Sequence, residues 1–353
     1  MRKRTYGVLV AGVLVGSVLT APYATGNERS RAVEEAVPNQ DPGFLQVYEA
    51  NVENLPTSSE NCPGDWHDLM YYMRLQQYRP DIYLVQQLSG QKQLDLLLTR
   101  MEEHFGEKYE GVVAEANPKP GGGVCGSDKT YQTNAVIWRA DRLDLKLSQS
   151  PENRWQAQHA PDPDRPDHCV NGTSSRTKGV KALLHDRVGN KDVTAASFHW
   201  PTQKSGGGTG PCATSNAGEL SNELTEDGYG VADLYVAGGD TNRAASSTNG
   251  GSDWTTWYKN SNGDLGGAHG FRDAAYAGCE GDAACLGEKW TFDGARRIDF
   301  LLARNGDSEP ATTTHHVVPT FDEGDQADLT LTGSDNEDLD YSDHRANGAR
   351  VHY

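Results

Sequence analysis

The sequence lacks a basic stripe. Its 353 residues carry 32 Lys and Arg against 50 Asp and Glu, which gives a formal net charge of -18 at pH 7, and the cations are scattered. A protein that grips a nucleic-acid backbone usually neutralises several phosphates with clustered cations. The composition therefore argues against tight DNA binding, although an acidic enzyme can still handle a phosphate polymer briefly when a bound cation carries the attraction.

Beyond the first 24 residues no apolar run is long enough to cross a bilayer. Residues 2–4 are basic, residues 7–19 are apolar and small residues follow around 21–24, a pattern typical of a secretory signal peptide. A proline near the expected cleavage site leaves a retained N-terminal anchor as the alternative. We expect a secreted monomer without stable membrane insertion, with a signal peptide at 1–24, a disordered linker at 25–42 and one domain at 43–353.

Cys-x-x-Cys pairs are also missing, which argues against a cysteine zinc site. The sequence has six cysteines, namely Cys62, Cys125, Cys169, Cys212, Cys279 and Cys285. An even number in an exported protein predicts three disulfides. Cys279 and Cys285 bracket a short loop and are expected to pair, whereas three connectivities stay open for the other four.

Strand-like and helix-like segments alternate along the domain, which indicates an α/β fold. Strands are expected at residues 45–50, 82–86, 109–114, 133–138, 143–147, 180–185, 193–199, 234–238, 298–302 and 349–351. Helices are expected at 66–78, 91–105 and 217–224. In the second of these helices the leucines recur on one face, which predicts that this face packs against the core.

Four polar clusters lie beside apolar runs in the second half of the chain. They are His199-Trp200-Pro201, Gly238-Gly239-Asp240-Thr241-Asn242, Arg297-Ile298-Asp299-Phe300 and Ser342-Asp343-His344-Arg345. Strand ends are where a rigid scaffold presents catalytic residues. Two histidines, three aspartates and an asparagine at one sheet edge are the groups needed to attack a phosphodiester with a divalent cation.

These clusters, preceded by Tyr48-Glu49-Ala50-Asn51-Val52, are similar in type and order to the motifs of the endonuclease/exonuclease/phosphatase superfamily. Members include pancreatic-type deoxyribonuclease, abasic-site endonucleases, neutral sphingomyelinases and inositol polyphosphate phosphatases. The resemblance covers most of the mature chain. It implies a four-layer αββα sandwich, in which two mixed β-sheets pack face to face with helices outside.

The resemblance also implies roles for the catalytic residues. His344 would be the base that deprotonates water, with Asp299 accepting its other ring N–H. His199 would donate to a phosphate oxygen or protonate the leaving group. Asp240 would orient a water or help to bind metal, and Asn242, expected two residues along the same extended backbone, would donate to the phosphate.

Arg176 is a further expected phosphate contact, and Asn51, Gln87 and Asp343 are the expected cation ligands. Oxygen ligands favour Mg²⁺ over Zn²⁺, with Mn²⁺ or Ca²⁺ as alternatives. Gln87 departs from the family pattern, which has a glutamate there, so the cation site loses one charge.

The leading hypothesis is therefore a secreted metal-dependent phosphodiesterase, a nuclease acting on extracellular DNA or RNA. A lipid phosphodiesterase, a phosphomonoesterase, and a binding protein that has lost catalysis are the alternatives.

Overall fold

A computed structural model describes residues 36–52, 70, 72–118, 131–162, 164–202, 210–244, 258, 268–292, 294–318 and 342–353. The expected signal peptide, the first part of the expected linker, residues 66–69 and 71 of the helix expected at 66–78, and Cys62 and Cys125 lie outside these residues. No helix in the described part of the chain is both long and apolar enough to span a membrane.

The first sheet has six strands in the spatial order β14-β15-β1-β2-β4-β3. Their bounds are β1 Phe44–Asn51, β2 Ile82–Leu88, β3 Tyr109–Val113, β4 Thr133–Arg139, β14 Thr313–Val317 and β15 Asn347–His352. β1 and β2 are parallel, and the other neighbours are antiparallel. All of these strands except β14 were predicted.

The second sheet has seven strands, ordered β12-β13-β11-β10-β9-β5, with β6 also paired to β9. Their bounds are β5 Leu143–Leu147, β6 Arg154–Gln156, β9 Lys178–Asp186, β10 Lys191–His199, β11 Leu234–Asp240, β12 Arg272–Asp273 and β13 Asp299–Asn305. β10 and β11 are parallel and the other pairs are antiparallel, so both sheets are mixed.

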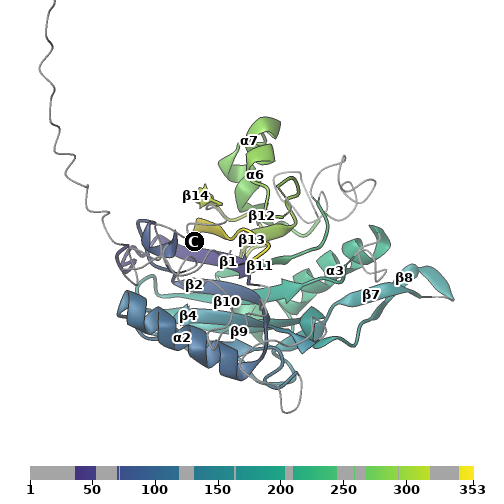
Figure 1. Cartoon of the computed structure of the whole chain (residues 1–353), viewed down its shortest axis with the longest axis horizontal. Helices are drawn as coiled ribbons and strands as arrows, with labels where there is room; N and C mark the ends of the chain where they lie inside the picture. The colour runs from purple at the N-terminus through teal and green to yellow at the C-terminus, as the bar shows by residue number, and fades with distance from the viewer. Residues whose placement is uncertain are drawn as a thin grey trace, which may run out of the picture. The chain divides into compact units, whose positions relative to one another are not determined.

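Three apolar cores separate four layers, which confirms the predicted sandwich (Figure 1). The central core lies between the sheets and holds Leu45 and Val136 from one sheet and Val180 and Val236 from the other. Side chains alternate along each strand, so β2 sends Leu84 into this core while its neighbours face the outer helix.

Helix α2 (Gln91–Phe105) covers the outer face of the first sheet with Leu94, Leu97 and Met101, as predicted. It ends at Gly106, whose left-handed backbone lets its N–H reach the Glu102 carbonyl. Helix α3 (Gly210–Glu223) covers the second sheet and begins earlier than the predicted 217, because its first turns contain small residues with no clear apolar period.

Two disulfides join described residues. Cys279–Cys285, the predicted pair, connects the short helices α6 (Ala274–Gly278) and α7 (Ala283–Glu288). Cys169–Cys212 ties α3 to a hairpin that was not predicted, formed by β7 (Gln158–Asp162) and β8 (Arg165–Asn171).

The last part of the expected linker packs on the domain. The Ala36 amide donates to the Arg74 carbonyl at 3.0 Å, and Asn39 is fully buried. The Asn39 side chain donates to the Phe44 carbonyl and to Asp81 at 3.0 and 2.7 Å. Residues 36–42, which were expected to belong to the linker, therefore include side chains and backbone groups that pack on the domain.

A buried ion network holds this segment at the end of the sandwich where β2 begins and β9 ends. Arg142 contacts Asp186 at 2.7 Å and Asp81 at 3.2 Å, and Arg139 contacts Asp81 at 2.9 Å; none of these four side chains is exposed. Arg142 also donates to the Asn39 carbonyl. The network thus links both sheets to the N-terminal segment.

We expect Arg142→Met to lower the free energy of unfolding by about 3–5 kcal/mol, because it leaves the buried Asp186 without its cation and Asp81 with Arg139 alone. Urea denaturation measures the change. Lys108→Met is the control, since Lys108 and Glu110 form an exposed pair and such pairs contribute little. Equal, small effects of the two substitutions would contradict this role for Arg142.

Candidate active site

Strand register brings three of the predicted site residues into one row. His199 lies opposite Asp240 in the parallel pair β10–β11, and Asp240 lies opposite Asp299 in the antiparallel pair β11–β13. All three are buried. They lie at the end of the second sheet, as the sequence predicted.

Two glycines of β11 allow close packing against β10 and against β1 of the other sheet. A Cβ at position 239 would lie 1.9 Å from the Phe198 carbonyl oxygen, and one at position 238 would lie 2.7 Å from Cγ of Glu49 in the other sheet. Gly238 and Gly239 are therefore required for close packing beside Asp240.

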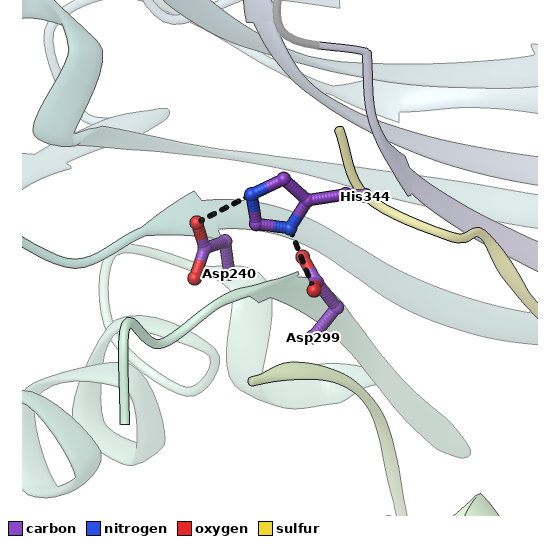
Figure 2. A group of neighbouring side chains, drawn as sticks. All are labelled: Asp240, Asp299 and His344. Atoms are coloured by element: carbon purple, nitrogen blue, oxygen red, sulfur yellow. Dashed lines mark hydrogen bonds and ion pairs between the residues drawn. The ribbon is translucent and has the colours of Figure 1, made fainter. Parts of the chain in front are cut away.

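His344 completes the row from the turn that precedes β15 (Figure 2). Its Nδ1 lies 2.8 Å from Oδ2 of Asp299, and its Nε2 lies 3.9 Å from Oδ2 of Asp240. The hydroxyl of Ser342 accepts from the His344 amide at 3.0 Å and donates to the Asn51 carbonyl. The Ser-Asp-His sequence thus forms a turn that is anchored to the end of β1.

The electrostatics of the row follow from burial. Desolvation, followed by the charge of Asp299, raises the pKa of Asp240 to about 7. Burial alone would lower the pKa of His344, but Asp299 and Asp240 outweigh it and raise this pKa to about 9. Without a bound cation, His344 therefore carries a proton at neutral pH and compensates the charge of the carboxylates.

Asp240, Asp299 and His344 can together hold a metal ion. Among the described residues, they form a group whose ligand atoms all lie within 4.8 Å of one another. Oδ1 of Asp299 is buried and has no hydrogen-bond partner among the described residues. An unpaired buried carboxylate oxygen beside a second carboxylate is a suitable place for a hard divalent cation.

The expected cation ligands lie around this group. The Asn51 amide donates to Oδ2 of Asp240 at 3.1 Å. Asp343 is 44% exposed, and its Oδ1 lies 3.6 Å from Nε2 of His344. Gln87 is directed instead at the neighbouring histidine, with its Nε2 3.4 Å from Nδ1 of His199.

Asn242 reaches His199 by a different backbone path from the one expected. The strand ends at Asp240, and Asn242 adopts φ 52°, so the backbone is not extended there. Its backbone N–H donates to Oδ1 of Asp240 at 2.6 Å, and its side-chain nitrogen lies 3.0 Å from Nε2 of His199. The turn that the Asp and Asn residues favour brings the two side chains together.

Arg176 lies on a short 3-10 turn, η2 (Ser175–Thr177), after the β7–β8 hairpin. Its Nε donates to Nε2 of His199 at 3.1 Å. Burial lowers the pKa of Arg176, while Asp240 and Asp343 act in the opposite direction. The predicted phosphate contact thus lies at the site.

Sequence analysis missed Glu49 as a site residue. It is fully buried, accepts from the Asn347 side chain at 2.9 Å, and has a pKa raised by burial and by Asp299. The inward positions before it on β1 are the apolar Leu45 and Val47. An acidic residue continuing that inward pattern was the signal that could have identified it.

Comparisons with known proteins support the fold. No protein-family model matches the sequence, and no curated protein sequence matches it either. The structure resembles an endonuclease/exonuclease/phosphatase from Bacteroides vulgatus, with a TM-score of 0.55, 14% identity, and coverage of 87% of this chain and 98% of that chain.

Two further solved structures resemble the chain. One is D. rerio TDP2 complexed with a single-strand DNA product, with TM-score 0.52, 15% identity, and coverage of 88% and 99% of the two chains. The other is a mannosyl-6-phosphatase from Bacteroides thetaiotaomicron, with TM-score 0.53, 13% identity, and coverage of 88% and 100%. The chain therefore has the DNase-I-like fold of endonuclease/exonuclease/phosphatase proteins.

The His344 pKa predicts how stability depends on pH. Because this pKa is about 9 in the folded protein against an ordinary 6.5, the folded state binds the proton more tightly than the unfolded chain does. The resulting stabilisation is complete below pH 6.5 and is lost as pH rises through 9. We expect the metal-free protein to lose on the order of 2–3 kcal/mol across this range.

Chemical denaturation in a chelator at pH 7, 8 and 9 checks this expectation. In His344→Gln, which cannot titrate, the slope of stability against pH should be flatter. An identical slope in both proteins would show that His344 is not protonated in the metal-free fold.

Proposed function

We propose that this chain, which has the DNase-I-like fold, is a secreted, divalent-metal-dependent phosphodiesterase that acts as a nuclease on DNA or RNA. One observation carries the proposal. Oδ2 of Asp240 lies between two imidazoles, 3.7 Å from Nε2 of His199 and 3.9 Å from Nε2 of His344. Two histidines that flank one carboxylate can serve the two sides of a phosphate during in-line attack, one ring as the base and the other by holding the donors Arg176 and Asn242.

His344 acts as the base in this proposal. The carboxylate of Asp299 fixes the ring through Nδ1 and leaves Nε2 to take a proton from water. Since Asp299 and Asp240 are the charges that raise the pKa of His344, neutralising them would bring this pKa closer to neutral pH. The ring can then be deprotonated at the start of the reaction.

A divalent cation, for which Mg²⁺ best suits the oxygen donors, would be held by Asp240 and Asp299 and would stabilise the charge on the phosphoryl oxygens. Asn51 and Asp343 would assist from the edge of the site. Arg176 and Asn242 meet at one nitrogen of His199 and are the donors available to a phosphate oxygen.

Nucleic acid is the favoured substrate class, handled transiently by a monomer. The DNA product bound by TDP2 supports it, whereas the mannosyl-6-phosphatase represents the phosphomonoesterase alternative. The negative charge of the chain agrees with brief rather than tight binding. Two disulfides support export from the cell.

A substrate panel tests this function. The purified protein is incubated with Mg²⁺, Mn²⁺ or Ca²⁺ and with plasmid DNA, RNA, sphingomyelin vesicles, or a sugar phosphate. Cleavage of DNA or RNA that a chelator abolishes is expected. Turnover of the sugar phosphate alone would favour the phosphomonoesterase, turnover of sphingomyelin alone the lipid enzyme, and no turnover the binding protein.

We expect His344→Ala to lower kcat by about 10²-fold to 10⁴-fold, because the base is lost. His199→Ala and Asp240→Asn should each lower kcat by about 10²-fold or more. The matched control is His185→Ala, since His185 pairs with Asp192 at the opposite end of β10. Activity of His344→Ala within a few-fold of the unmodified protein would contradict the mechanism.

A further inference from the structure

Gln87 has an unusual place in the first sheet. It adopts φ 66°, in the left-handed region, where the pairing of β2 with β4 shifts between Val85 and Leu88. The residue is 3% exposed, so the bulge directs its amide into the protein, against His199. A positive φ in a buried non-glycine residue persists only where surrounding contacts hold it.

Hydrogen bonds decide which ring nitrogen of His199 carries the proton. Nε2 of His199 receives the Nε–H of Arg176 at 3.1 Å, and a guanidinium can only donate. The Asn242 amide nitrogen, 3.0 Å from the same Nε2, also donates to the Trp200 carbonyl at 2.7 Å, which fixes its orientation. Nε2 is therefore the acceptor, and the ring proton is on Nδ1.

The Nδ1–H faces Gln87, whose side-chain oxygen can accept it. With the amide nitrogen of Gln87 facing Nδ1 at 3.4 Å, two donors would meet, while Oε1 of Gln87 is buried with no hydrogen-bond partner among the described residues. Amide oxygen and nitrogen are assigned from the hydrogen-bond network. Turning the amide places Oε1 against Nδ1–H and removes the conflict.

Asn134 on β4 connects the two groups that hold His199. Its Oδ1 accepts from the backbone N–H of Gln87 at 3.4 Å. Its side-chain nitrogen donates to the backbone carbonyls of Arg176 at 2.9 Å and Lys178 at 2.6 Å. The bulge lies in β2 of the first sheet and the 3-10 turn leads into β9 of the second, so Asn134 links the two segments on either side of His199.

We infer that Gln87 is a positioning residue for His199, accepting its Nδ1–H and holding Nε2 toward Arg176 and Asn242, and that its amide oxygen is thereby committed to the ring instead of to a cation. The contact stands on the geometry alone, and its catalytic importance rests on the proposed function. A neutral amide suits this place because it accepts the proton without adding a charge beside Arg176.

Histidine-labelled ¹⁵N NMR of the metal-free protein tests the contact independently of activity. In the unmodified protein we expect His199, assigned by its loss in His199→Asn, to show the Nδ1–H tautomer and a slowly exchanging ring proton. Gln87→Met, which is similar in length but has no acceptor, should lose that proton signal. Gln86→Met is the matched control, because the buried Gln86 amide contacts Ser197 and Gly238 rather than the ring.

Gln87→Glu retains an acceptor and should retain the ring-proton signal, which covers the case in which Gln87→Met does not fold.

Mn²⁺ titration by calorimetry gives the second measurement. Gln87→Met should change the affinity of the protein for Mn²⁺ by less than about two-fold, against the 10–100-fold typical of removing a group that supports a metal site. Where turnover is found, kcat of Gln87→Met should fall by about ten-fold and recover in part in Gln87→Glu.

Finding His199 of the unmodified protein as the Nε2–H tautomer would overturn the inference. So would a Gln87→Met protein that keeps the ring-proton signal but binds Mn²⁺ much more weakly, because Gln87 would then serve the cation. If no substrate is cleaved, the proposed function fails, yet the NMR result still decides whether Gln87 holds His199.

Discussion

Burial of two adjacent carboxylates is the constraint on which the site depends. Asp240 and Asp299 face each other in neighbouring strands, and in a dry environment two such charges repel strongly. His344 compensates them by bonding Asp299 at 2.8 Å and approaching Asp240 from the turn that precedes β15. The charge balance of the site therefore depends on these three side chains together.

The far end of the sandwich obeys the same rule in a different way. There Arg142 and Arg139 compensate the charges of Asp81 and Asp186, and all four side chains are fully buried. A guanidinium stays charged at any accessible pH, so that end is locked, whereas an imidazole can lose its proton. The fold thus has a permanent ion network where stability is needed and a titratable one where a proton has to move.

Most strands and the order of the site residues could be predicted from local patterns. Alternation of apolar residues predicted β1, β2, β9, β10 and β11. The polar clusters beside β10, β11, β13 and β15 predicted that His199, Asp240, Asp299 and His344 would lie together. The β7–β8 hairpin was missed because it is polar and is held by a disulfide to α3 rather than by a buried face. The direction of Gln87 could not be foreseen either, because it follows from a one-residue shift of pairing that leaves no mark in the sequence pattern.

The glutamine at position 87 does not leave this site short of negative charge. Glu49, Asp240 and Asp299 are all buried in the same region, and the pKa of Glu49 is already raised by burial and by Asp299. A fourth carboxylate on the bulge would add repulsion to a group that His344 compensates with a protonated imidazole. Because Gln87 also faces His199, exchanging the amide for a carboxylate would change the charge next to the ring as well as next to the carboxylates. The departure from the motif that the sequence otherwise resembles is thus consistent with the charge balance of this chain, in which Glu49 on β1 already adds a third buried carboxyl group and the amide on β2 adds none.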